Sequence, residues 1–106
     1  MKFSNGVQIC YGNVSYTIAS WLAWGQIYQG LDSNNDGIDI AFAQPFIEIP
    51  TTSIMCTLTS GNAVIGETHN QISTTGITDI CAMRPNSSSS ALGGCIISYI
   101  AIGKWK

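Results

Sequence analysis

The sequence carries very little charge. Only 9% of its 106 residues are Asp, Glu, Lys or Arg, where about 25% is typical of a globular domain. Four cations against six acids leave a formal net charge of −2, which argues against a nucleic-acid-binding protein, because that class needs clustered Lys and Arg. Hydrophobic residues meanwhile make up 45% of the chain. Since so few charges cannot cover the surface of a monomer, we expect part of that surface to contact other chains.

Long apolar runs and targeting signals are missing as well. No run reaches the roughly 18 residues of a membrane-spanning helix, and the first residues do not follow a signal-peptide pattern. The length suits one core, so we expect a single domain over 1–106 that does not insert into a membrane. The glycosylation sequons at Asn13 and Asn86 are then chance matches, because that modification requires secretion.

Closely paired metal ligands are also absent. The chain has one histidine and four cysteines with no CxxC pair, so no zinc site and no other cofactor is expected. Each cysteine lies among apolar neighbours, which favours buried free thiols over disulfides and predicts folding in a reducing cytosol. The four are Cys10, Cys56, Cys81 and Cys95.

One segment partly matches a calcium-binding loop. Residues 32–37 place oxygen-bearing side chains at the first, third and fifth loop positions and glycine at the sixth. The twelfth position, which needs a bidentate carboxylate, is Ala43. Asn, Asp and Gly are also the ordinary residues of a β-turn. We therefore interpret the segment as a turn, with a weak surface cation site as the alternative.

Catalytic groups are scarce. His69 lies in a polar stretch that we expect to be a loop tip, and no G-x-S-x-G nucleophile elbow occurs. A glycosidase needs two facing carboxylates. Glu48 and Asp79 could form such a pair, but nothing in the sequence marks them. The prediction is that the protein is not an enzyme.

Apolar and polar residues alternate with period two nearly everywhere, as in Ile38, Ile40 and Phe42 around two small or acidic residues. This pattern, interrupted by Asn, Asp and Gly turns, predicts an all-β protein, an antiparallel β-sandwich of about six to eight short strands. The last apolar segment is hydrophobic on both faces, so it must be covered on both sides. The expected strands are 7–11, 14–18, 25–28, 39–42, 53–59, 71–73, 77–83 and 95–102.

Trp21 and Trp24 lie in the segment 20–24, which we expect to connect two strands. Their flat faces could form a platform for a pyranose ring. Alternatively they fill the core or a subunit interface, which is the commoner role of large aromatic side chains.

Three further segments carry a family resemblance. They are the run FAQPFIEIP at 42–50, the run TTGI at 74–77 and the run YIAIG at 99–103. In this order, and with the opening segment 4–12, they resemble the C-terminal tip domain of bacteriophage tail fibres. The same three landmarks occur in H-type (snail agglutinin-like) lectins. Tyr11 stands where the tail-fibre pattern usually has tryptophan.

The resemblance implies a homotrimer at the distal tip of a virion tail fibre, made in the bacterial cytoplasm. Its partners would be a host surface polysaccharide, lipopolysaccharide, teichoic acid or outer-membrane protein. Such a tip follows a long fibre shaft, so Met1 is expected to begin a fragment. The last strand would lie near the threefold axis. The trimer interface is expected to use Ile97, Tyr99, Ala101 and Trp105.

The resemblance also implies where a receptor binds. The sugar site of the lectins uses the loop between the last two strands, which here begins with Arg84 and includes Asn86. The aromatic–histidine pair of the lectins is missing, so their sugar specificity is not implied. His69 and Asn70 are added as contacts for their polarity and loop position. The leading function is binding of a surface glycan; the alternatives are a free-standing H-type lectin and a trimerisation cap that touches no receptor.

Overall fold

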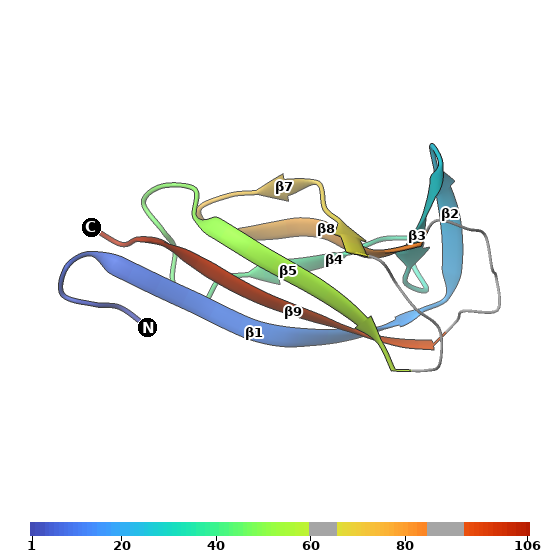
Figure 1. The fold of residues 1–106 in the computed structure, drawn as a ribbon, viewed down its shortest axis with the longest axis horizontal. Coiled ribbons are helices and arrows are strands. Elements are labelled where there is room, and N and C mark those ends of the chain that lie inside the picture. Colours follow the sequence, from blue (N-terminus) through green and yellow to red (C-terminus); the bar gives the residue numbers. More distant parts are fainter. Residues whose placement is uncertain (60–65, 85–92) are drawn as a thin grey trace.

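The computed structural model describes residues 1–59, 66–84 and 93–106, and their regular secondary structure consists of β-strands (Figure 1). The all-β prediction is therefore confirmed, and no helix in the described part of the chain could cross a membrane. The strands of these described residues are β1 (Val7–Ile18), β2 (Ser20–Trp24), β3 (Ile27–Leu31), β4 (Ile38–Ala41), β5 (Thr51–Leu58), β6 (Gly66–Thr68), β7 (Gln71–Ile72), β8 (Gly76–Arg84) and β9 (Gly93–Lys104).

The strands form two antiparallel sheets. One has the order β1-β9-β5, and the other runs β2-β3-β8-β4, with β6 and β7 also pairing with β8. β8 is thus the organising strand of the second sheet, because four other strands hydrogen-bond along it in turn. The hairpin of β2 and β3 projects at the end of the molecule opposite the two termini (Figure 1).

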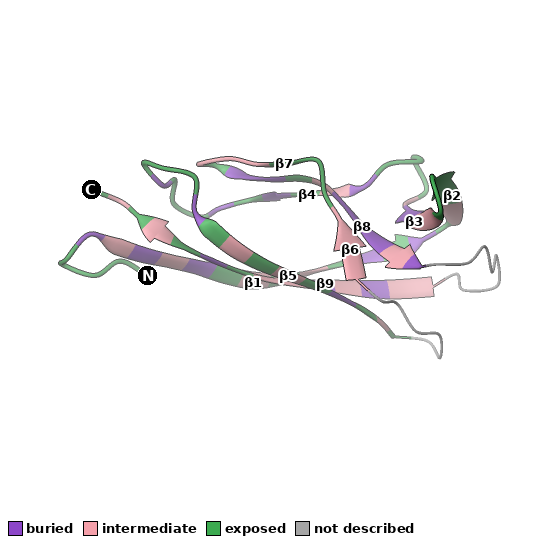
Figure 2. Cartoon of the chain, turned by 45° about the horizontal axis from the view of Figure 1, so that its top comes forward, coloured by how far each residue is buried: buried purple, intermediate pink, exposed green. Residues whose placement is uncertain are grey.

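The core lies between the two sheets (Figure 2). Ile97 of β9 faces it from the first sheet, and Ile77 and Ile80 of β8 face it from the second, all completely buried. Phe42 directly follows β4 and is buried, and its ring meets that of Phe46 edge-on at 5.3 Å between centroids. The apolar surface removed from water by these side chains is what holds the two sheets together.

The first two expected strands are one. Gly12 and Asn13 were expected to turn the chain, but β1 continues through them and pairs with β9 over its full length. Gly12 lies opposite Tyr99, and a Cβ there would come within 3.3 Å of the tyrosine ring. Asn13 accepts a 2.7 Å hydrogen bond from the Ser98 hydroxyl. Both turn-type residues are therefore used by the neighbouring strand, and the expected break was wrong.

The segment 20–24 was also wrongly expected to be a connection, because it forms β2. The turn lies one step later, where Gly25 takes a positive φ of 64° and the hairpin returns as β3. β3 therefore occupies Ile27–Leu31 rather than 25–28. The stretch expected to be a loop tip contains a strand as well, since β6 (Gly66–Thr68) pairs with β8 just before His69.

Gly76 is constrained by space rather than by its backbone angles. A Cβ at this position would collide with the carbonyl oxygen of Ile40 on the neighbouring strand β4. Gly76→Ala is expected to lower the free energy of unfolding by about 3 kcal/mol, because a rigid backbone atom must move. Chemical denaturation measures this. Gly66→Ala is the control, since its Cβ would meet only the flexible end of Met83, at 3.2 Å; an equal loss in both variants would contradict the steric explanation.

Candidate functional site

An open cleft of about 290 Å³ lies beside the projecting hairpin. It brings together three of the predicted binding residues from distant parts of the sequence. Trp24 comes from the end of β2, while His69 and Asn70 directly follow β6. Among the described residues, the cleft is lined by Trp24, Gln29, Thr68, His69, Asn70 and Asp79.

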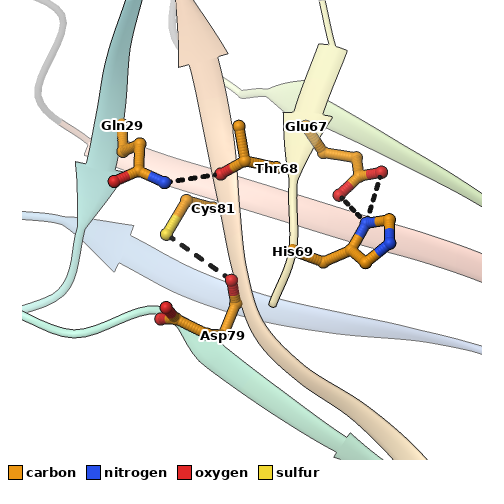
Figure 3. Close-up of polar contacts among 6 residues, drawn as sticks. All are labelled: Gln29, Glu67, Thr68, His69, Asp79 and Cys81. Carbon is orange, nitrogen blue, oxygen red and sulfur yellow. Dashed lines mark hydrogen bonds and ion pairs between the residues drawn. The ribbon is translucent and has the colours of Figure 1, made fainter. Parts of the chain in front are cut away.

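The hairpin supplies one wall of the cleft. Leu22 pairs with Gln29 and Trp24 pairs with Ile27, so these four side chains share one face of the β2–β3 ribbon. Trp24 is 62% exposed, which leaves its indole face open to a ligand. The Gln29 amide donates a 2.8 Å hydrogen bond to the Thr68 hydroxyl (Figure 3). This bond ties the hairpin to β6 and fixes the separation of the two walls.

His69 is held by an acidic neighbour. Its Nδ1 lies 3.0 Å from Oε2 and 3.1 Å from Oε1 of Glu67 (Figure 3). The carboxylate orients the ring and favours a proton on Nδ1, so the neutral ring presents Nε2 as an acceptor. Next along the chain, the backbone N–H of Asn70 donates to the Thr78 carbonyl at 2.9 Å. Both residues thus occupy fixed positions at the cleft.

Asp79 sits at a bulge in β8. Ile38 pairs with Ile80 and Ile40 with Ile77, so two residues of β8 oppose the single Asp39 of β4. Asp79 has a left-handed φ of 58°, a conformation that costs about 1 kcal/mol in a non-glycine residue. A bulge of this kind re-aims a side chain, and here it places a carboxylate in the lining of the cleft.

Hydrogen bonds hold Asp79 in this position. Its backbone N–H donates to the Asp39 carboxylate at 2.9 Å, and its Oδ1 accepts from the Gly37 N–H at 3.0 Å. A Cβ at Gly37 would collide with the Asp79 carboxylate and lie 2.8 Å from the Cys81 sulfur. Glycine at position 37 is therefore needed for this close approach.

Cys81 lies beneath the cleft as a buried thiol, with its Sγ 3.9 Å from the Asp79 carbonyl oxygen (Figure 3). Burial, followed by the charge of Asp79 and the more distant Asp36 and Asp32, raises the pKa of Cys81 to about 12. The thiol is therefore protonated at neutral pH and is not a nucleophile. All four cysteines are buried and free, as their apolar neighbours predicted.

The acidic segment 32–37 forms a turn. Oδ1 of Asp32 accepts hydrogen bonds from the backbone N–H groups of Asn34 at 2.9 Å and Asp36 at 3.1 Å. Asn35 adopts a positive φ of 57°, as Asn does in turns. These bonds favour the β-turn over the calcium loop. Among the described residues, no group of three or more His, Cys, Asp or Glu side chains could hold a metal ion.

Trp21 and Arg84 form a separate pair. The two tryptophans point to opposite faces of the hairpin because they are three residues apart on one strand. The guanidinium carbon of Arg84 lies 5.4 Å from the centre of the Trp21 ring, and Arg84 is only 8% exposed. This arrangement braces the base of the hairpin. Asn86 lies outside the described residues.

The residues predicted for a trimer interface mostly face inward. Ile97 and Ala101 are completely buried within one protomer, and Tyr99 lies on the same face, its ring 6.3 Å from that of Phe42. Trp105 is partly buried between Lys2 and Lys106, whose Nζ atoms each lie 5.1 Å from its ring centre. The residues of β9 that point away from the core are the alternate ones, including Ile96, Ile100 and Ile102.

Sequence reasoning missed Gln29 and Thr68, and it considered Asp79 only as half of a glycosidase pair with Glu48. The feature that could have singled out Asp79 as a binding residue is that it is the one carboxylate in the mainly apolar strand β8. Gln29 and Thr68 gave no such signal, since their place at the cleft depends on a pairing between distant strands.

No protein-family model matches the chain, and no curated protein sequence matches it.

Proposed function

We propose that this chain is a non-catalytic receptor-binding domain that takes a bacterial surface glycan in the cleft beside Trp24. The observation that carries the proposal is the convergence of Trp24, His69 and Asn70 on one opening of about 290 Å³. An exposed indole offers a flat apolar surface for the face of a pyranose ring. Fixed side-chain donors and acceptors beside it suit the ring's hydroxyl groups.

The polar groups at the cleft are suited to binding rather than to catalysis. Asp79 is anchored to Gly37, and Glu67 is paired with His69. Glu48, the other half of the conceivable glycosidase pair, does not line the cleft. The proposal is accordingly a lectin-like interaction that leaves the glycan intact.

The test is a binding screen. The purified protein is applied to an array of bacterial surface polysaccharides and oligosaccharides, and positive glycans are titrated by calorimetry. We expect saturable binding to a defined glycan, with no reducing ends released on prolonged incubation. Failure to bind any glycan on the array would remove the proposal, and release of sugar would replace it with a hydrolase.

We further propose that the chain is the tip domain of a phage tail fibre and works as a homotrimer. Besides the sequence resemblance, the outer face of the β1-β9-β5 sheet supports this. Tyr11 and Met55 are 68% and 66% exposed there, and Ile100 and Ile102 lie exposed between the flanking strands. In the paired rows from Ile9–Ile102–Thr51 to Ser15–Ile96–Thr57, no outward residue is charged. A charge-free face of this kind suits burial against identical copies.

The mass of the particle in solution tests the assembly. Light scattering coupled to size exclusion is expected to give three times the chain mass of 11.3 kDa. A monodisperse monomer at micromolar concentration would contradict the trimer. Three weak sites on one particle would gain avidity for a repetitive surface, which fits adsorption to a cell envelope.

Two alternative functions predict different experimental results. A free-standing H-type lectin would bind one defined sugar that also blocks binding as the free monosaccharide. A trimerisation cap would leave adsorption to the host unchanged when the cleft is altered at Trp24. Host adsorption by fibres carrying the altered tip separates the cap from the receptor-binding domain.

A further inference from the structure

The charges at the cleft are of one sign. Asp79 lines it directly, and Glu67 lies behind His69 with one carboxylate oxygen 3.0 Å from the ring. None of the described lining residues is Lys or Arg, and Arg84 is instead placed over Trp21. A ligand in this cleft therefore meets net negative charge.

The same negative charge also acts on the neighbouring thiol of Cys81 and raises its pKa. After burial, the charge of Asp79 is the next largest cause that raises the pKa of Cys81, and Asp36 and Asp32 add to it. Carboxylates from two segments, β8 and the turn at 32–37, thus act together on this thiol. An anionic ligand would be repelled here, while a cationic group would be attracted.

One carboxylate oxygen of Asp79 is available to a ligand in the cleft. Oδ1 is engaged by the Gly37 N–H, whereas Oδ2 has no hydrogen-bond partner among the described residues. The strained backbone, the bulge and the bond to Asp39 together fix where this oxygen lies. A carboxylate that is fixed before the ligand arrives loses little side-chain entropy on binding. It can accept a strong, charge-assisted hydrogen bond from an ammonium group.

We propose that the cleft selects a sugar unit with a protonated amino group, held by Oδ2 of Asp79 while the ring stacks on Trp24. This inference rests on the proposed glycan-binding function and names its ligand class. Sugars bearing uronic acid or phosphate groups are disfavoured. Among the candidate receptors, a polysaccharide with free amino sugars therefore fits better than a phosphate-rich teichoic acid.

The test compares three matched probes at a pH where the amine carries its proton. The probes are an oligomer of glucosamine, its fully N-acetylated counterpart and an oligomer of glucuronic acid, each titrated against the intact protein. We expect the amine to bind about fivefold more tightly than the N-acetylated oligomer, and the uronic acid to bind most weakly. Added salt is expected to reduce the preference, because it screens the charge.

Asp79→Asn isolates the charge. Asparagine keeps a side-chain oxygen that can accept from the Gly37 N–H, and it tolerates the left-handed backbone conformation. In this variant the amine and its N-acetylated counterpart are expected to bind equally. Glu48→Gln is the matched control, because it removes a carboxylate that does not line the cleft and should leave the preference intact. An unchanged thermal midpoint verifies that both variants are folded.

The outcomes distinguish a failure of the amino-sugar specificity from a failure of the proposed glycan-binding function. Equal binding of the amine and N-acetylated probes by the unaltered protein, or tightest binding of the uronic acid, overturns the amino-sugar specificity alone. A preference that survives in Asp79→Asn overturns the role of Asp79. Absence of binding to these probes and to every glycan of the array removes the glycan-binding function itself.

Discussion

Replacing Trp24 with alanine is expected to lower glycan affinity by at least tenfold while leaving the fold intact. The indole is the largest apolar surface at the cleft, and its stacking on a sugar ring is worth about 1.5–3 kcal/mol, or roughly a tenfold to hundredfold change in affinity. Its 62% exposure means that truncation opens no cavity in the core. Calorimetric titration with a monovalent oligosaccharide measures the effect without avidity.

Two companion variants sharpen this result. Trp24→Phe keeps a smaller stacking face and is expected to retain part of the affinity. Tyr11→Ala removes an equally exposed aromatic side chain from the other sheet and is expected to leave the affinity per site unchanged. Full binding by Trp24→Ala, or an equal loss in Tyr11→Ala, would show that the ligand lies elsewhere.

The alternation of side chains made the sheets predictable. Ile40 and Phe42 follow the two-residue alternation of apolar side chains, and both are buried in the core as that alternation predicts. Turn chemistry was a poorer guide. Gly12 and Asn13 have the composition of a turn, yet Tyr99 and Ser98 of the neighbouring strand use them inside β1. Whether such a pair turns or continues depends on a partner strand far away in the sequence.

The candidate site shows the same contrast between what the sequence could predict and what it could not. Trp24, His69 and Asn70 were chosen for their chemistry, but nothing in the sequence placed them at one cleft. Their meeting depends on β3 and β6 both pairing with β8. Asp79 lies at a bulge, a one-residue irregularity in register. The same bulge turns both Ile77 and Ile80 to the core, although they are three residues apart. The sequence therefore indicated which residue types could bind a ligand, but it did not indicate which of these residues lie next to one another in the fold.

The interface prediction shows why strand parity matters. β9 is apolar on both faces, so the sequence alone did not say which row meets the core. The structure assigns Cys95, Ile97 and Ala101 to the interior, and a shift by one residue would exchange the rows. The outward row of β9 is therefore the one that the proposed trimer would bury.

Ile100→Asp is accordingly expected to abolish the trimer. Ile100 is exposed in one protomer and stands between Tyr11 and Ser53 in the middle of the charge-free face. An aspartate there would be buried without a partner in each of three copies, at a cost of several kcal/mol per protomer. Light scattering is expected to give the mass of one chain. The protomer should stay folded, because this side chain does not contribute to its core.

Leu22→Asp is the matched control, since it places the same charge on an exposed apolar residue of the other sheet and is expected to leave the mass unchanged. The variant Ile100→Asp also tests how the proposed trimer contributes to the proposed glycan binding. Monovalent sugar should bind Ile100→Asp as before, whereas adhesion to a polymeric glycan should fall by about a hundredfold or more with the loss of avidity. A trimer that persists in Ile100→Asp would place the contact between copies on a different surface, and undiminished adhesion by a monomer would mean that one cleft is enough.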